Sequence, residues 1–236
     1  MPSRFTPITT VLLLLLALGG CTEAPGYPRE GPPAPPDQIT DFHTLYSANC
    51  QACHGVNGRN GPAIDLANPE YQVLVDDQTL RNVISNGMPG TQMPAWAQSA
   101  GGMLTDVQIN ALVAGMRRDW GKPSFSGAIP PPYTQNRSGD IQRGRQLYQA
   151  RCAACHQTAA RQQITSPVYL SLVSDQALRT IIIAGRPDIG QPDWRHDDPG
   201  GAAPPLADQD VTDIVTYLHF LRDQAAASAA PIAPRR

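Results

Sequence analysis

Four of the five cysteines lie in two copies of one short pattern, Cys-x-x-Cys-His, in the segments CQACH (50–54) and CAACH (152–156). A disulfide framework, a thioredoxin-like redox pair or half of a zinc site would each explain a pair of cysteines. None of these explains why a histidine directly follows each pair, or why the pattern occurs twice. Covalent haem attachment explains both, because two thiols add to the vinyl groups on one edge of a porphyrin while the adjacent imidazole reaches the iron.

The pattern therefore predicts two covalently bound haem c groups. The expected attachment residues are Cys50, Cys53, Cys152 and Cys155, and the expected first iron ligands are His54 and His156.

The surroundings of the two motifs repeat as well. Segment 76–96 aligns with segment 174–194 without a gap, and nine of the twenty-one positions are identical. In both copies a residue type that caps helices begins the segment, and a glycine suited to a helix end follows eleven residues later. These residues are Asp76 and Ser174 at the start, and Gly87 and Gly185 at the end.

Amphipathic segments flank the repeated parts. One precedes each Cys-x-x-Cys-His motif, and one with i, i+3, i+4, i+7 spacing closes each copy. The apolar positions of the first kind are Ile39, Phe42, Leu45 and Tyr46, and Ile141, Leu147 and Tyr148; those of the second kind are Ile109, Leu112, Val113 and Met116, and Val211, Ile214, Val215 and Leu218. The chain is predicted to be all-α, a tandem duplication of one helical unit.

In this order of elements the chain resembles the class I cytochrome c family, with a haem motif after a first helix, a central helix ending in glycine, a loop MPAW (93–96) and a terminal helix. The resemblance implies two tandem class I cytochrome c-like domains, each a few helices wrapped around one covalently bound haem. In that family the methionine of the loop is the second axial ligand, which maps onto Met93. Met88, also followed by proline, is the competing candidate, and Met103 and Met116 are interpreted as packing residues.

The second copy lacks this methionine, because Gln191 stands at the position of Met93. Three fates are open for the sixth position of the iron held by His156. Gln191 could bind it weakly through its carbonyl oxygen, or His196 could swing in to make a bis-histidine haem. Alternatively the position is open or filled by water, with Gln191, Arg186 and His196 forming a distal pocket. His43 and His219 are interpreted as surface residues.

The N-terminus has the order of an export signal: Arg4, an apolar run (11–18) too short to span a bilayer comfortably, and small residues ending at Cys21. It resembles a bacterial lipoprotein signal, which implies that Cys21 becomes the lipidated first residue of the mature protein. The expected location is the periplasmic side of a bacterial membrane, with the inner or outer membrane undecided.

The distribution of prolines predicts the domain boundaries. The 24 prolines of the 236 residues concentrate between two compact pieces and at the chain ends. The expected parts are a signal peptide 1–21, a Pro-rich tether 22–37, a first cytochrome c domain 38–120, a Pro-rich linker 121–138, a second domain 139–224 and a flexible tail 225–236. A net charge of −2 does not indicate the basic surface that nucleic-acid binding requires.

Two functions are consistent with these features, besides a third possibility that the second domain is mainly a docking module whose haem is redox-sluggish. The first is a membrane-tethered dihaem cytochrome that relays single electrons between a quinol-oxidising or dehydrogenase complex and a soluble cytochrome or terminal oxidase. The second is a haem enzyme, in which an open second haem reduces a small molecule such as peroxide and the first haem feeds it electrons. No single residue is predicted to be catalytic in the first case.

Overall fold

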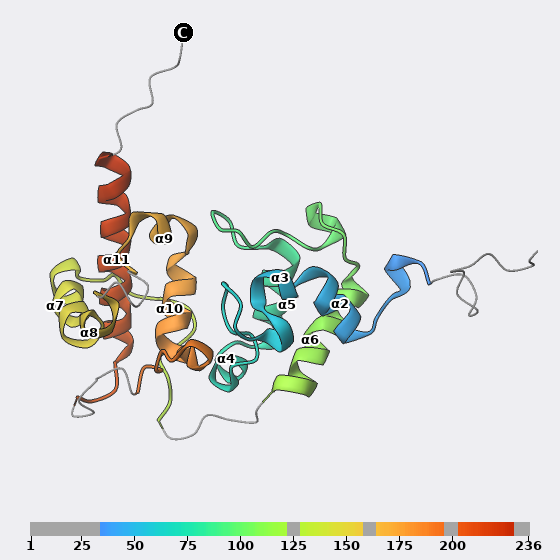
Figure 1. Cartoon of the computed structure of the whole chain (residues 1–236), viewed down its shortest axis with the longest axis horizontal. Helices are drawn as coiled ribbons and strands as arrows, with labels where there is room; N and C mark the ends of the chain where they lie inside the picture. The colour runs from blue at the N-terminus through green and yellow to red at the C-terminus, as the bar shows by residue number, and fades with distance from the viewer. Residues whose placement is uncertain (1–33, 122–127, 158–163, 196–202, 229–236) are drawn as a thin grey trace, which may run out of the picture. The chain divides into compact units, whose positions relative to one another are not determined.

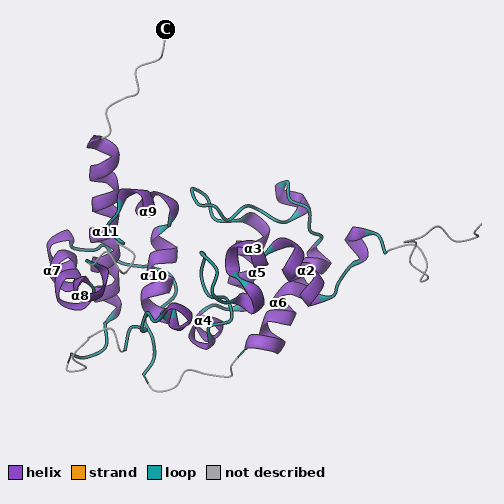
Figure 2. Ribbon diagram, in the orientation of Figure 1, coloured by secondary structure: helices purple, strands orange, loops and turns teal. Residues whose placement is uncertain are grey.

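A computed structural model describes residues 34–121, 128–157, 164–195 and 203–228. The chain divides into two units at Gln38. The first unit contributes one short 3-10 helix, Pro36–Gln38 (η1), and the second contributes every other described element. Among these residues the regular structure is helical throughout, without a strand (Figure 2). The all-α prediction is confirmed.

The two predicted repeats, called here the first and second domains, contain matching sets of α-helices (Figure 1). In the first domain these are α2 (Phe42–Asn49), α3 (Gln51–His54), α4 (Pro69–Leu74), α5 (Asp77–Asn86) and α6 (Asp106–Trp120). In the second they are α7 (Ile141–Arg151), α8 (Ala153–His156), α9 (Pro167–Leu172), α10 (Asp175–Ala184) and α11 (Asp208–Ser228), so α11 continues past residue 224.

The central helices begin and end where the sequence predicts. Asp76 accepts a hydrogen bond from the Thr79 amide at the start of α5, and Ser174 caps α10 in the same way. Gly87 and Gly185 end these helices with φ of 67° and 72°, in the left-handed region that glycine adopts without strain. Each end is followed at once by the loop that carries position 93 or 191.

The first domain is built on the packing of α2 against α6. The apolar side chains that the sequence assigns to these helices are buried: Phe42, Leu45, Tyr46, Ile109, Leu112, Val113 and Met116. Met116 is therefore a packing residue as predicted, but the same prediction for Met103 is wrong, because this side chain is 69% exposed. Met103 lies in the turn before α6, beyond the reach of the core.

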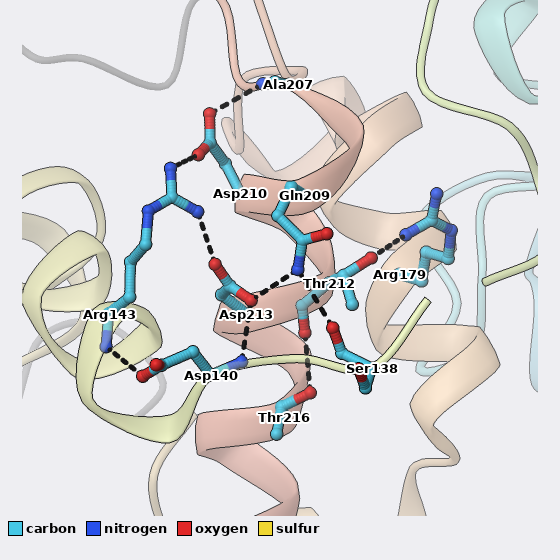
Figure 3. A network of polar contacts seen from close by, with 10 residues as sticks. All are labelled: Ser138, Asp140, Arg143, Arg179, Ala207, Gln209, Asp210, Thr212, Asp213 and Thr216. Atoms are coloured by element: carbon cyan, nitrogen blue, oxygen red, sulfur yellow. Dashed lines mark hydrogen bonds and ion pairs between the residues drawn. The ribbon is translucent and has the colours of Figure 1, made fainter. Parts of the chain in front are cut away.

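The second domain repeats this plan with α7 against α11. Its core includes Tyr148, Val211, Ile214, Val215 and Leu218. A polar network joins the same two helices at their N-terminal ends, where the buried carboxylate of Asp213 accepts hydrogen bonds from the Asp140 amide, Gln209 and Arg143 (Figure 3). This network fixes the start of α7, and therefore the direction in which the chain enters the second Cys-x-x-Cys-His motif.

No helix in the described part of the chain is both long and apolar enough to cross a membrane.

Candidate haem sites

In the first domain the Cys-x-x-Cys-His motif forms a single helical turn. Cys50 ends α2 and starts α3, and Cys53 and His54 lie on α3 itself. Neither cysteine is in a disulfide. Burial, together with the neighbouring Cys53 thiol, raises the pKa of Cys50 to about 12. Both thiols and the imidazole are thus presented by one short, regular element.

The imidazole of His54 is oriented by one hydrogen bond. Its Nδ1 lies 2.9 Å from the carbonyl oxygen of Ile64. Because a carbonyl only accepts, Nδ1 must donate, which leaves Nε2 without a proton and able to bind a metal. Burial lowers the pKa of His54, the hydrogen bond to Ile64 opposes this, and the nearby positive charge of Arg186 lowers the pKa further, which favours the neutral ring.

The loop after His54 is packed tightly against the motif. A Cβ atom added to Gly61 would lie 2.4 Å from the carbonyl oxygen of Cys53 and equally close to the Gly55 amide. The hydroxyl of Tyr46 donates to the carbonyl oxygen of Gly55 at 2.8 Å. These contacts fix the backbone on both sides of His54.

The loops that carry Met93 and Gln191 share one closing hydrogen bond, whereas the Gln191 amide also donates to the Arg186 carbonyl oxygen at 2.9 Å and the Met93 amide donates to the Thr91 hydroxyl at 3.1 Å. The Met88 amide donates to the Met93 carbonyl oxygen at 3.0 Å, and the Arg186 amide donates to the Gln191 carbonyl oxygen, also at 3.0 Å. Met93 and Gln191 are therefore structurally equivalent positions, and both side chains are half-buried. The Gln191 side chain amide lies 3.4 Å from the Ile181 carbonyl oxygen at the end of α10.

Arg186 does not belong to a distal pocket in the second domain, contrary to one of the alternatives raised by the sequence. Its side chain is buried, and its guanidinium donates to the carbonyl oxygens of Gly61 and Ala63 in the first domain and to Asp188. The guanidinium of Arg186 therefore donates its hydrogen bonds to oxygen atoms of the protein. The sequence could not reveal this, because the contact joins residues more than 120 positions apart.

The remaining candidates are placed as follows. His156 is half-buried on α8 beside Cys152 and Cys155, and neither of these cysteines is in a disulfide. His43 pairs with Asp119, and His219 pairs with Asp175 and Asp223, so both are surface residues as predicted. His196 and Cys21 lie outside the described residues.

The residues of the first domain fit a c-type haem. Two thiols outside any disulfide and a half-buried imidazole oriented through Nδ1 are the donors that the group requires. Nothing in the second motif departs from this set of residue types.

Comparison with known families agrees with this chemistry. Residues 37–114 match the model of cytochrome c oxidase, cbb3-type, subunit III, and residues 141–222 match the model of cytochrome c. The chain is a class I c-type cytochrome with two haem domains. Its role is redox chemistry by electron transfer, and it binds c-type haem.

Comparisons with individual proteins add little. No curated protein matches this cytochrome. Among solved structures it is similar to a chain of the Kuenenia stuttgartiensis reducing HAO-like protein complex, at 15% identity and a TM-score of 0.44, with 76% of this chain and 94% of that chain covered.

Proposed function

We propose that this cytochrome carries two covalently bound haem c groups and relays single electrons on the periplasmic side of a bacterial membrane. Cys50 and Cys53 attach the first haem, and Cys152 and Cys155 attach the second. His54 and His156 are the proximal ligands. When bound, each haem iron exchanges one electron by cycling between Fe(II) and Fe(III).

The observation that carries this proposal is the state of His54. A half-buried imidazole whose Nδ1 donates to the Ile64 carbonyl cannot rotate freely, so it presents Nε2 in one direction. A ligand set that keeps its geometry in both oxidation states limits the reorganisation that each electron transfer requires. This arrangement suits a relay better than a site that must open to a substrate.

The two haems are proposed to differ at the sixth position. Met93 provides a thioether, a soft neutral ligand that favours Fe(II) and raises the reduction potential. The second haem lacks this ligand, whether Gln191, His196 or water takes its place. Its residues would therefore give it the lower potential, and electrons would pass from the second haem to the first.

The proposed setting follows from the N-terminal sequence. Lipidation of Cys21 would tether the protein, since several acyl chains at about 0.8 kcal/mol per buried CH₂ give stable anchorage. The proposed partners are redox proteins: a quinol-oxidising or dehydrogenase complex as donor, and a soluble cytochrome or terminal oxidase as acceptor. The peroxidase-like alternative is less favoured. Arg186 donates its hydrogen bonds to the carbonyl oxygens of Gly61 and Ala63, so it is not available to assist O–O cleavage.

A haemochrome assay tests the assignment of the cofactors. Protein made with the c-type maturation machinery should contain two covalently bound haems per chain. The double variant Cys152→Ala, Cys155→Ala should contain one. If the wild type contains one haem, or if the haem is extracted by acidified organic solvent, the proposal fails.

Fractionation tests the tether. Cys21→Ser should move the protein from the membrane fraction to the soluble periplasm, and mass spectrometry of the wild type should find an acylated Cys21 at the N-terminus. A Cys21→Ser protein that stays with the membrane would mean that a partner subunit or an uncleaved leader holds it.

A further inference from the structure

Segment 60–70 of the first domain lies against segment 184–195 of the second. The Asn60 amide donates to the Asp188 carboxylate at 2.9 Å, and the Asn68 side chain donates to the Ala184 carbonyl oxygen at 2.7 Å. The first segment contains Ile64, the partner of His54. The second contains the loop of Gln191. The proximal side of the first haem site is thus joined to the distal loop of the second.

Arg186 is the main connection between these segments. The side chain is 5% exposed, and it donates to the carbonyl oxygens of Ala63 at 2.7 Å and Gly61 at 2.9 Å. The Nε and Nη2 atoms of the same guanidinium also donate to the Asp188 carboxylate, at 2.9 and 2.8 Å. A planar guanidinium used on both edges holds two carbonyls and a carboxylate in one geometry.

The two carbonyls belong to the loop that orients His54. Gly61 packs on the backbone of Cys53, His54 and Gly55, and the Ala63 amide donates to the Cys53 carbonyl oxygen at 2.9 Å. Ile64, the next residue, accepts the bond from His54 Nδ1. A contact made by the second domain therefore reaches the proximal ligand of the first haem through only one or two residues.

We propose that Arg186 and Asp188 form an interdomain clamp that positions the proximal loop of the first haem and sets the reduction potential of that haem. Arg186 and Asp188 are positioning residues in this role, since neither contacts the haem ligands directly. The proposal rests on attachment of the first haem at Cys50 and Cys53, as proposed above.

The charges around the clamp make its effect measurable. Asp65 is 1% exposed beside it; burial first, and the charge of Asp188 next, raise the pKa of Asp65, while Arg59 and Arg186 oppose the rise. With Arg186 paired to Asp188 the clamp itself is neutral. Loss of one partner leaves an uncompensated charge in a place that water screens poorly. The oxidised haem has one more positive charge than the reduced haem, so the sign of that charge determines the direction of the shift.

The test is a pair of substitutions that change charge in opposite directions. Arg186→Gln removes a positive charge and should lower the potential of the first haem, whereas Asp188→Asn removes a negative charge and should raise it. A shift equal to a tenfold change in the ratio of oxidised to reduced haem corresponds to about 59 mV for one electron. Redox titration followed by NMR gives the two potentials separately, because each haem is assigned through the thioether protons of its own cysteine pair.

Two further variants separate charge from folding. Arg186→Lys keeps the charge but loses the planar fork, so it should shift the potential of the first haem less than Arg186→Gln does, and the shift that remains measures the contribution of positioning. Arg195→Gln breaks another interdomain pair, with Glu70 at 3.3 Å, and serves as the matched control with little effect on the first haem. Haem content and circular dichroism identify a variant that fails to fold.

The proposal is overturned if Arg186→Gln and Asp188→Asn shift the first haem in the same direction, if neither shifts it, or if Arg195→Gln shifts it equally. These outcomes are distinct from failure of the proposed function. A chain without haem at Cys50 and Cys53 would give no thioether resonances for that motif in the first place.

Discussion

At the scale of single residues, Met93 and Gln191 differ in side chain but share one backbone contact. Each carbonyl accepts a 3.0 Å hydrogen bond from the residue five positions earlier, and each loop follows a glycine with positive φ. The two copies thus keep this closing hydrogen bond, although six of the ten positions in 87–96 and 185–194 differ, and the thioether of Met93 is replaced by the amide of Gln191. A thioether binds Fe(II) better than an amide oxygen does, so with the proposed ligands the exchange would alter the iron site while the helices around the loop stay the same.

This equivalence predicts the outcome of restoring the methionine. In the wild type, carbon monoxide should bind to half of the reduced haem if the second iron is open or capped by Gln191. Gln191→Met should then abolish this binding and add a second near-infrared sulfur-to-iron band, whereas Met93→Gln should expose the first haem to carbon monoxide. Optical spectra with and without the gas measure both effects.

The same measurement identifies the alternative. If wild-type protein binds no carbon monoxide, a strong ligand such as His196 occupies the second iron, and His196→Ala should open it. Two methionine bands in the wild type would contradict the equivalence of positions 93 and 191.

At the scale of helices, the two domains place the glycine and the aromatic residue of one helix crossing on opposite helices. In the first, the ring of Phe42 on α2 fills the space left by Gly115 on α6; a Cβ atom at Gly115 would lie 2.1 Å from the ring. In the second, Gly144 on α7 receives the backbone of Asp213 and the side chain of Tyr217 on α11. Counting along the repeat, Gly144 corresponds to Phe42 and Tyr217 corresponds to Gly115. The aromatic residue thus lies on the first of the two helices in the first domain and on the last helix in the second, and in both domains the two helices pack closely.

The sequence predicted these four helices and their apolar faces, and the buried residues agree with it. It did not predict the exchange of glycine and aromatic residue, because periodicity gives the face of each helix separately. Which residue fills which gap depends on where two helices cross. That information lies in pairs of positions that are about 70 residues apart, and it becomes visible only when both helices are in place.

Gly115→Ala tests the crossing. Helix propensity alone would make this substitution stabilising by about 0.5–1 kcal/mol. The contact with Phe42 should reverse the sign and destabilise the first domain by about 1–3 kcal/mol, through displacement of the ring or of the helix. Chemical denaturation of the holoprotein measures the change in the free energy of unfolding.

The rescue is the double variant Phe42→Gly, Gly115→Tyr, which copies the arrangement of the second domain. It should be more stable than the sum of the two single changes predicts. A stabilising effect of Gly115→Ala would show that α2 and α6 are not in close contact at this position.

At the scale of the whole molecule, the Pro-rich linker and the domain contact have a structural role that composition did not reveal. Arg179 donates to the Pro132 carbonyl oxygen at 2.8 and 2.9 Å, Gln176 donates to that of Tyr133, and Tyr133 packs against the core of the first domain. Leu74 packs against the second core and Ala184 against the first. Proline content predicts a connection between compact pieces, but only the fold determines whether that connection is packed.

Asn68 shows how closely the two domains depend on each other. This buried side chain accepts a hydrogen bond from the Glu70 amide at 2.8 Å and so caps α4 in the first domain, while its amide group donates to the Ala184 and Gly185 carbonyl oxygens at the end of α10 in the second. One residue thereby satisfies unpaired backbone groups of two helices that belong to different domains.

Asn68→Ala removes both sets of bonds at once and should lower the free energy of unfolding by about 1–3 kcal/mol. The loss should appear in both domains, as faster hydrogen exchange in α4 and in α10 of the holoprotein, because each helix end relies on the other domain to hold this side chain in place. Asn110→Ala, which removes only an exposed bond to Arg81, is the matched control and should leave both helices unchanged. If exchange in Asn68→Ala increases in α4 alone, the second domain is stable without the first, and the two haem domains are independent units that happen to touch.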